Sequence, residues 1–170
     1  LIIVFMVMTA AAVSVFAADS RAVSFNDGWT FHLGDTAGAS APDFDDAAWR
    51  KLSLPHDWAI EGDFSKDNPS GTGGGALPGG IGWYRKTFEL TRADLRKHIY
   101  VDFDGAYMNA TVYINGHELG TRPYGYASFS YDLTPWLHAG RNVIAVRVDN
   151  AEQPNSRWYS GAGIYRPVVL

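Results

Sequence analysis

The sequence contains no cysteine, so disulfide bridges, thiolate metal sites and a cysteine nucleophile are excluded. It also lacks an excess of positive charge, because 14 Lys and Arg residues stand against 18 Asp and Glu residues, a formal net charge of −4. Nucleic acids and anionic lipid surfaces are bound through basic patches, and we therefore expect neither as a partner.

Long helical patterns are scarce, and apolar residues alternate with the period of a β-strand. Four segments show this alternation: residues 83–90, 99–104, 110–114 and 142–149. Asn115-Gly116 follows the third segment and is typical of a type I′ hairpin turn, because both residues tolerate a positive φ. Short strands joined by Gly, Pro and Asn turns predict an all-β fold, an antiparallel β-sandwich.

The last of these strands carries a clear two-sided pattern. Ile144, Val146 and Val148 are expected to face the core, whereas Arg147 and Asp149 are expected on the opposite side. Helical signals are confined to single turns at 44–49, 91–94 and 132–137. The first turn should begin at its Asp-Asp pair, and the second should begin at a capping box. The last predicted strand begins near Ile164-Tyr165.

The only long hydrophobic run lies at the N-terminus. Residues 1–16 are almost wholly apolar, and Val15 and Ala17 occupy the −3 and −1 positions of a signal-peptidase site. The run is short for a membrane span, which needs about 20 apolar residues. We expect residues 1–17 to be a cleaved export signal, without a stable membrane span, and the protein to be periplasmic or extracellular. An uncleaved anchor is the alternative.

Both ends of the sequence are abrupt. The chain begins without Met or a basic flank, and it ends in the strand formers GIYRPVVL without a polar tail. We therefore expect a fragment of a longer protein.

A glycine-rich stretch, GTGGGALPGGIG at 71–82, matches the dinucleotide-binding pattern G-x-G-x-x-G/A in its first six residues. That pattern functions only between a strand and a helix, because the pyrophosphate binds at the helix N-terminus. Neither flank has the required element, so phosphate binding is rejected. The stretch is predicted to be a long loop of the kind that carries binding residues.

The titratable residues give no catalytic constellation. The five histidines have no metal-ligand spacing and are expected at the surface or in loops. Asp102 and Asp104 share the outer face of a strand, where a glycosidase pair is conceivable, but a solvated strand face is favoured. His56 and Asp57 are adjacent on an extended chain and point apart, so a structural loop is preferred to acid–base chemistry.

Six stretches together resemble the N-terminal domain of glycoside hydrolase family 2, the family of β-galactosidases, β-glucuronidases and β-mannosidases. The likeness runs from about residue 24 to the end of the chain, and the whole set is specific although each element alone is weak. The elements are Asn26-Asp27-Gly28-Trp29, Phe44-Asp45-Asp46 through Leu54-Pro55-His56-Asp57-Trp58, Gly82-Trp83-Tyr84-Arg85, Phe103-Asp104-Gly105-Ala106 through Asn115-Gly116, Phe129 through Asn142-Val143, and Val148-Asp149-Asn150 through Trp158-Tyr159-Ser160-Gly161-Ala162-Gly163-Ile164-Tyr165-Arg166.

The resemblance implies that residues 18–170 form the family's jelly-roll-like, galactose-binding-domain-like sandwich. An immunoglobulin-like domain and a (β/α)₈ barrel would follow it and be its partners. The two catalytic glutamates belong to that barrel, so no catalytic residue is expected in these residues. The whole protein would be an exported retaining glycosidase, with a β-galactoside favoured as its carbohydrate substrate.

The resemblance also assigns substrate-binding residues. Asp149 matches an aspartate that contacts sugar hydroxyls, directly or through a bound cation, although capping of a turn is an equal alternative. Asn150 and Trp158 are placed with it, and packing is the alternative for Trp158. No cofactor is expected beyond a possible monovalent or divalent cation in the whole enzyme.

Two features limit what the resemblance implies. Some relatives carry a sugar-binding Asn before the Gly82 strand, where this chain has Gly79-Gly80-Ile81, and Asn68 is a weak substitute for it. The other function that fits is a free-standing secreted carbohydrate-binding module without catalysis.

Overall fold

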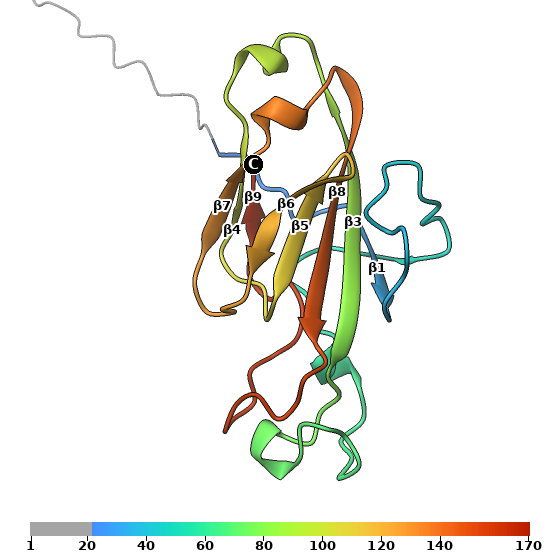
Figure 1. Ribbon diagram of the computed structural model, residues 1–170, viewed down its shortest axis with the longest axis vertical. Coiled ribbons are helices and arrows are strands. Elements are labelled where there is room, and N and C mark those ends of the chain that lie inside the picture. Colours follow the sequence, from blue (N-terminus) through green and yellow to red (C-terminus); the bar gives the residue numbers. More distant parts are fainter. Residues whose placement is uncertain (1–21) are drawn as a thin grey trace, which may run out of the picture.

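The computed structural model describes residues 22–170, so the predicted export signal lies outside the described residues. The strands form two antiparallel sheets, one with the order β2-β1-β3-β8-β5-β6 and one with the order β7-β4-β9 (Figure 1). The two sheets enclose a common hydrophobic core. The all-β sandwich that the sequence predicts is therefore confirmed.

The elements are short apart from two long central strands. The larger sheet comprises β1 (Trp29–Leu33), β2 (Arg50–Leu52), β3 (Gly80–Leu90), β5 (Ala110–Ile114), β6 (His117–Arg122) and β8 (Gly140–Asn150). The smaller sheet comprises β4 (Tyr100–Phe103), β7 (Phe129–Asp132) and β9 (Val168–Val169). In the described part of the chain the helical elements are the 3-10 turns η1 (Ala59–Glu61), η2 (Thr72–Gly74), η3 (Asp94–Arg96) and η4 (Thr134–Trp136).

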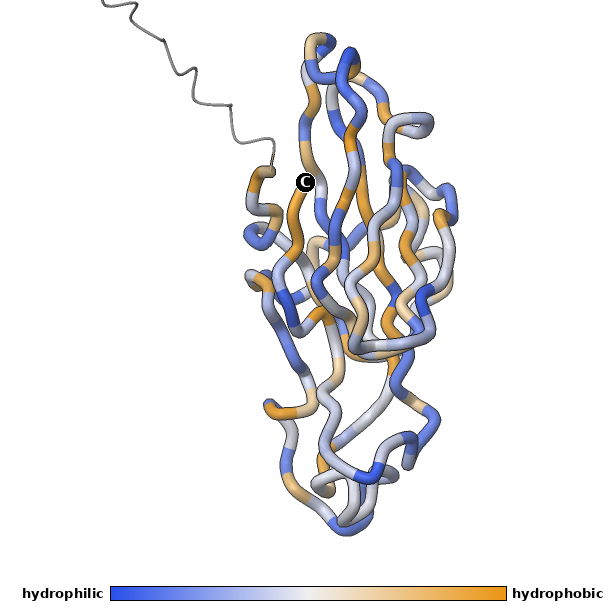
Figure 2. Tube along the Cα trace, turned by 90° about the vertical axis from the view of Figure 1, so that its left-hand side faces the viewer, coloured by the Kyte–Doolittle hydropathy of each residue, from blue (hydrophilic) through white to orange (hydrophobic). Residues whose placement is uncertain are grey.

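β3 and β8 are the two central strands of the larger sheet and pair with each other. Their pairing runs without interruption from Leu90↔Gly140 to Gly80↔Asn150. Figure 1 shows that the loops 59–79 and 151–163 lie together at the Gly80/Asn150 end of these strands, below the rest of the sandwich. The view turned by 90° shows the same elongated arrangement, with that end occupied by loops (Figure 2).

The side-chain alternation of β8 is as predicted. Ile144, Val146 and Val148 are buried in the core between the sheets, together with Trp29 and Phe103. The opposite face of β8 is covered as well, because a second cluster contains Ala39, Trp83 and Ala145. Both faces of this strand are therefore shielded from water over most of its length.

Local turn signals also hold. Asn115 and Gly116 have φ values of 49° and 83°, as a type I′ turn requires. The Thr91 hydroxyl accepts from the Asp94 amide at 3.2 Å, and the Asp94 carboxylate accepts from the Thr91 amide at 3.0 Å. This capping box opens η3.

The predicted single turn at 44–49 is present, but it is not helical. The Trp49 amide donates to the Asp46 carbonyl at 3.0 Å, and Asp45 Oδ1 accepts from the Ala47 amide at 3.0 Å. The Asp46 carboxylate accepts from the Thr30 hydroxyl at 2.6 Å.

One sequence-based expectation is wrong. Ile164 and Tyr165 lie outside the last strand, which begins at Val168. The Gly163 and Tyr107 backbones pair in an isolated bridge just before, and this bridge fixes the chain upstream of β9.

Arg85 is a buried cation that the sequence did not reveal. It lies in β3 with 1% of its surface exposed, and its guanidinium donates to the carbonyls of Ala39, Ala41 and Phe44 in the loop that covers β8. Its Nε lies 3.3 Å from the Asp46 carboxylate without hydrogen-bond geometry. Burial lowers the pKa of Arg85, and Asp46 opposes that shift.

We expect Arg85→Ala to lower the free energy of unfolding by about 3–5 kcal/mol, because it leaves buried carbonyls without donors. Urea denaturation of the chain measures this loss. The matched control is Arg141→Ala, since Arg141 donates to the Pro42 carbonyl of the same loop but is exposed. A control loss as large as that of Arg85→Ala would contradict the role given to burial.

Candidate functional site

The candidate site is built at the loop end of β3 and β8. The glycine-rich loop closes on itself, because the Ala76 amide donates to the Gly71 carbonyl at 2.7 Å and the Asn68 side chain donates to the Ala76 carbonyl at 2.7 Å. Gly75 has a φ of 83°, in the left-handed region that favours glycine. Gly79 approaches the next loop so closely that a Cβ there would lie 2.5 Å from the Asn150 carbonyl oxygen.

These contacts explain the abundance of glycine in residues 71–82. Its helical element is the three-residue η2, and its last residues, 80–82, already belong to β3, so it lacks the helix that a dinucleotide site needs. Glycine is used here for backbone geometry and close approach. Asn68, the weak substitute for the sugar-binding Asn of some relatives, holds the loop together instead.

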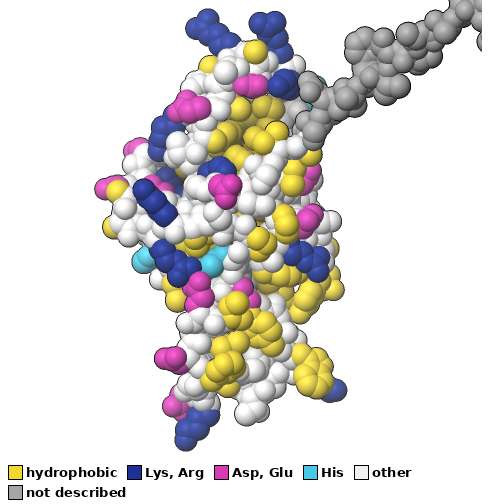
Figure 3. Space-filling view, turned by 180° about the vertical axis from the view of Figure 1, so that it is seen from behind, with side chains coloured by type: hydrophobic (Ala, Val, Ile, Leu, Met, Phe, Trp, Pro, Cys, Tyr) yellow, Lys and Arg dark blue, Asp and Glu magenta, His cyan; other side chains and the backbone are white. Residues whose placement is uncertain are grey.

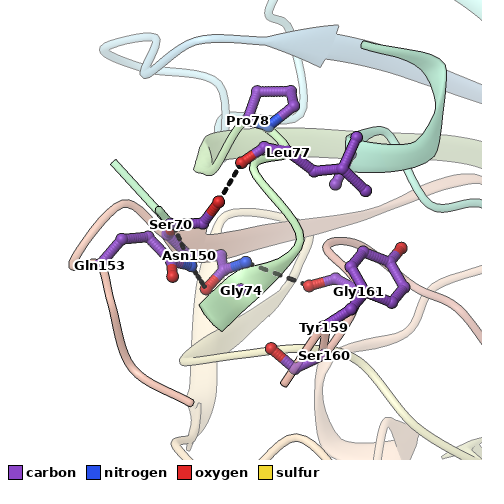
Figure 4. Close-up of a pocket in the computed structure, with 10 residues that line it drawn as sticks. Ser70, Gly74, Leu77, Pro78, Asn150, Gln153, Tyr159, Ser160 and Gly161 are labelled. Carbon is purple, nitrogen blue, oxygen red and sulfur yellow. Dashed lines mark hydrogen bonds between the residues drawn. The ribbon is translucent and has the colours of Figure 1, made fainter. Parts of the chain in front are cut away.

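Buried polar contacts hold each of the loops 59–79 and 151–163, as Figure 4 shows. In the first loop the Ser70 hydroxyl donates to the Leu77 carbonyl at 2.7 Å. At the second loop the Asn150 amide donates to the Gly161 carbonyl at 3.1 Å, and the Gln153 amide donates to Asn150 Oδ1 at 2.7 Å. Asn150 is 3% exposed, so its side chain organises the loop 151–163 from within.

The cavity between these loops is too small for a sugar. Its volume is about 10 Å³, close to the minimum for a single water molecule. Small-molecule sites usually enclose about 300–1,000 Å³. A sugar at this end of the sandwich must therefore lie against the outer surface of the loops.

Asp149 is the penultimate residue of β8, at this end of the sandwich. Its side chain is 28% exposed, and its Oδ2 accepts from Arg147 at 3.1 Å. Its Oδ1 accepts from the Ala151 amide at 3.1 Å, as in a turn cap. The structure thus shows the turn contact that the sequence analysis weighed against sugar binding, and both oxygens still have lone pairs to offer.

Arg147 links Asp149 to a second carboxylate, Asp35. The guanidinium lies 2.9 Å from Asp35 Oδ2, and the Trp83 indole donates to Asp35 Oδ1 at 2.9 Å. These hydrogen bonds lower the pKa of Asp35 to about 2, with Arg147 as the largest cause. The same pair raises the pKa of Arg147, so this group stays charged beside Asp149.

Trp158 is the most exposed aromatic residue of the neighbouring loop. Its side chain is 74% exposed, whereas the adjacent Tyr159 is 43% exposed. Among the interactions recorded for the described residues, Trp158 is held through its backbone amide, which donates to the Ser156 hydroxyl at 3.2 Å. The indole ring is thus available to a ligand or to another surface.

Asp57 fixes the loop that carries Trp158. Its Oδ1 accepts from the amides of Ala59 and Ala162 at 3.0 and 2.9 Å, and its Oδ2 accepts from the Tyr159 hydroxyl. Burial and this carboxylate both raise the pKa of Tyr159. The geometry agrees with the structural loop that the sequence predicts around His56 and Asp57.

Asp57→Asn should loosen residues 159–162, because an amide offers one acceptor oxygen where the carboxylate offers two. We expect the Ala162 amide to exchange about 5- to 150-fold faster, equivalent to about 1–3 kcal/mol of local opening. Hydrogen exchange followed by NMR measures this. Asp104→Asn, at an exposed carboxylate, should leave that amide unchanged. Equal protection in wild type and Asp57→Asn would contradict the anchoring role.

His56 lies in a loop, as predicted, but it is buried rather than at the surface, with 8% of its area exposed. Arg50 Nη2 lies 2.7 Å from His56 Nε2, and since arginine only donates, Nε2 is the acceptor. Nδ1 then carries the proton, and it donates to the Tyr84 hydroxyl at 2.8 Å. The ring is neutral, and packing against Tyr84, which is distant in sequence, buries it.

Burial lowers the pKa of His56 below its usual 6.5, although Glu61 Oε2 at 3.3 Å opposes the shift. The unfolded chain then binds a proton more readily than the folded chain, so stability is complete above pH 6.5 and falls below it. We expect His56→Gln to flatten the decline in unfolding free energy between pH 7 and about pH 5. Denaturation at several pH values tests this.

His98 supplies the control, because its side chain is exposed to solvent. His98→Gln should retain the wild-type pH slope. If His56→Gln also retained that slope, the buried neutral state of His56 would be refuted.

The remaining candidates stay apart from this end. Asp102 and Asp104 are exposed and line an open groove of about 510 Å³ with Arg122, which agrees with a solvated strand face. In residues 22–170 no group of three or more His, Asp or Glu side chains is arranged to hold a metal ion. Within the same residues no helix is long and apolar enough to cross a membrane.

Comparison with known proteins identifies a family and several relatives of this chain. Residues 76–170 match the family model described as "Glycosyl hydrolases family 2, sugar binding domain". The chain is 69% identical over 147 residues to the beta-galactosidase BoGH2A of Bacteroides ovatus, covering 86% of this chain and 17% of that protein. It is 52% identical, over 86% of its length, to a protein of Formosa agariphila provisionally named a beta-glucuronidase, of which it covers 14%.

A solved structure has the same fold. The crystal structure of a beta-glycosidase from Bacteroides vulgatus matches with a TM-score of 0.86 and 50% sequence identity. The match covers 88% of this chain and 20% of that one. The chain therefore spans less than a quarter of the length of these relatives.

Proposed function

We propose, from the premise that this chain belongs to the glycosyl hydrolases of family 2 and carries their sugar-binding domain, that it positions the sugar in a retaining β-galactosidase. The observation that supports this most is the position of Asp149 near the end of β8, directly before the loop 151–163 that carries the exposed Trp158. A carboxylate and an exposed indole are the groups that recognise sugar hydroxyls and the C–H face of a pyranose.

Each residue has a distinct part in this proposal. Asp149 accepts hydrogen bonds from sugar hydroxyls through the lone pairs that Arg147 and the Ala151 amide leave free. Trp158 packs on the sugar ring, and Asn150 holds the loop 151–163 from inside. The hydrolysis itself is a double displacement by two glutamates, which the family resemblance assigns to a barrel outside these 170 residues.

Two observations favour a β-galactoside over a β-glucuronide as the substrate: the negative charge of Asp149 and the higher sequence identity to the relative named a beta-galactosidase. Asp149 is a partly exposed carboxylate, and it repels the carboxylate of a uronic acid. A neutral galactoside meets no such repulsion. The β-glucuronide is the second candidate, because a relative named for that activity matches at 52% identity.

Export accompanies this function in the proposal. The apolar residues 1–16 and the small residues at the predicted cleavage site favour secretion to the periplasm or the medium. Edman degradation of the mature protein tests this, since cleavage after Ala17 places Ala18 at the N-terminus.

The test uses the intact protein with p-nitrophenyl β-galactoside, β-glucuronide and β-mannoside. We expect the galactoside to give the highest kcat/KM. A protein that binds galactosides but hydrolyses none of the three would be a carbohydrate-binding module, and the enzymatic proposal would fail.

Asp149→Asn should lower kcat/KM for the galactoside by about 10- to 100-fold, because a charged acceptor to a sugar hydroxyl contributes about 1.5–3 kcal/mol. The matched control is Asp35→Asn, since Asp35 binds the same arginine from the other side. If both variants lose activity equally, Asp149 acts through Arg147 and not through the sugar.

A further inference from the structure

A second groove lies along the β1–β2 edge of the larger sheet, and neither Asp149 nor Trp158 lines it. Its volume is about 460 Å³, within the range of small-molecule sites. It is lined by Phe31, His32, Trp49, Arg50, Trp58 and Glu61, among others. Figure 3 shows basic, acidic and histidine side chains side by side on the rear face, above a hydrophobic area at the loop end.

Stacked rings form much of the lining of this groove. His32 and Trp49 stack with centroids 5.3 Å apart and planes inclined by 22°. Phe31 and Trp58 stack deeper, at 5.8 Å and 24°. His32 is exposed, so its ring is open to a ligand. Trp49 is partly exposed and also packs against Phe44 and the cluster that contains Trp83, so it backs the His32 ring. Phe31 and Trp58 are buried supports.

A fixed ion pair supplies the polar part of the groove. Arg50 donates to both carboxylate oxygens of Glu61, at 2.9 and 2.8 Å, and also to His56 Nε2. The Arg50 and Glu61 side chains nevertheless remain 51% and 43% exposed. The pair therefore presents oriented donors and acceptors to the groove at little further entropic cost.

We propose that this groove is a second saccharide site, which binds a neutral pyranose of a glycan chain. The Trp49–His32 stack would pack against the C–H face of the sugar, and Glu61 and Arg50 would accept from and donate to adjacent hydroxyls. A uronic acid is disfavoured because Glu61 already neutralises Arg50 and would repel a second carboxylate. The choice of galactan as the probe rests on the proposed function.

The first test is native affinity electrophoresis of the intact protein in gels that contain soluble β-1,4-galactan. We expect Trp49→Ala to weaken the retardation by about tenfold in apparent Kd, because the stacking ring is lost. Glu61→Gln, which preserves the shape of the groove, should weaken it several-fold, and this variant decides the matter if Trp49→Ala does not fold.

The matched control is Trp136→Ala. Trp136 also stacks on a histidine, His117, and is 43% exposed, but it does not line this groove. We expect it to be retarded like the wild type. Equal retardation of the wild type, Trp49→Ala and Glu61→Gln would overturn the proposal.

Photo-crosslinking locates the site directly. A diazirine-bearing galactobiose, followed by peptide mass spectrometry, should label peptides that contain Trp49 or residues 58–62. Labelling confined to residues 149–160 would overturn the second site. An absence of label from the peptides with Trp49 or residues 58–62 in the intact protein would overturn it as well. Hydrolysis is assayed in parallel, so that a retarded but inactive protein refutes the proposed enzymatic function and leaves this inference standing.

Discussion

The uninterrupted pairing of β3 with β8 is the constraint on which the rest of the molecule depends. Eleven consecutive residue pairs align the two strands, and they end at Gly80 and Asn150. The loops that adjoin these two residues lie side by side, because Gly80 and Asn150 are paired across the sheet. Asp149 and the glycine-rich loop are therefore brought together by the sheet, and the loops need to supply only the final contacts.

Buried polar side chains complete what the sheet begins. Arg85 ties the loop 39–46 to one face of β3, Asn150 holds the loop 151–163, and one oxygen of Asp57 joins the amides of Ala59 and Ala162. Hydrogen bonds offset the cost of removing these groups from water, although Arg85 Nε itself has no hydrogen-bond partner. The loop end is closely packed, since the cavity left within it has room for about one water molecule.

Much of this fold follows from local sequence, and the rest does not, for a physical reason. The β5 strand and the Asn115-Gly116 turn depend on neighbouring residues, and both lie where the pattern predicts them. His56 and Arg85 are buried by residues distant in the chain, so no local pattern reveals their environment. Asp149 was found through family resemblance, whereas the groove at Trp49 needs β2 and η1 to be brought together in space.

The exposure of the site residues has a consequence for how a sugar is held. Tight small-molecule sites bury most of the ligand surface, and a ligand lying on Asp149 and Trp158 is covered from one side only. The cavity between the neighbouring loops admits no sugar, so in the proposed enzyme the second wall of the site is supplied from outside the described residues. This geometry favours a domain that completes a site over one that forms a whole site, as proposed for the family 2 enzyme. The two proposed sugar sites differ in this respect, because the groove beside Trp49 has its own rings, its own ion pair and enough volume to hold a pyranose within this chain.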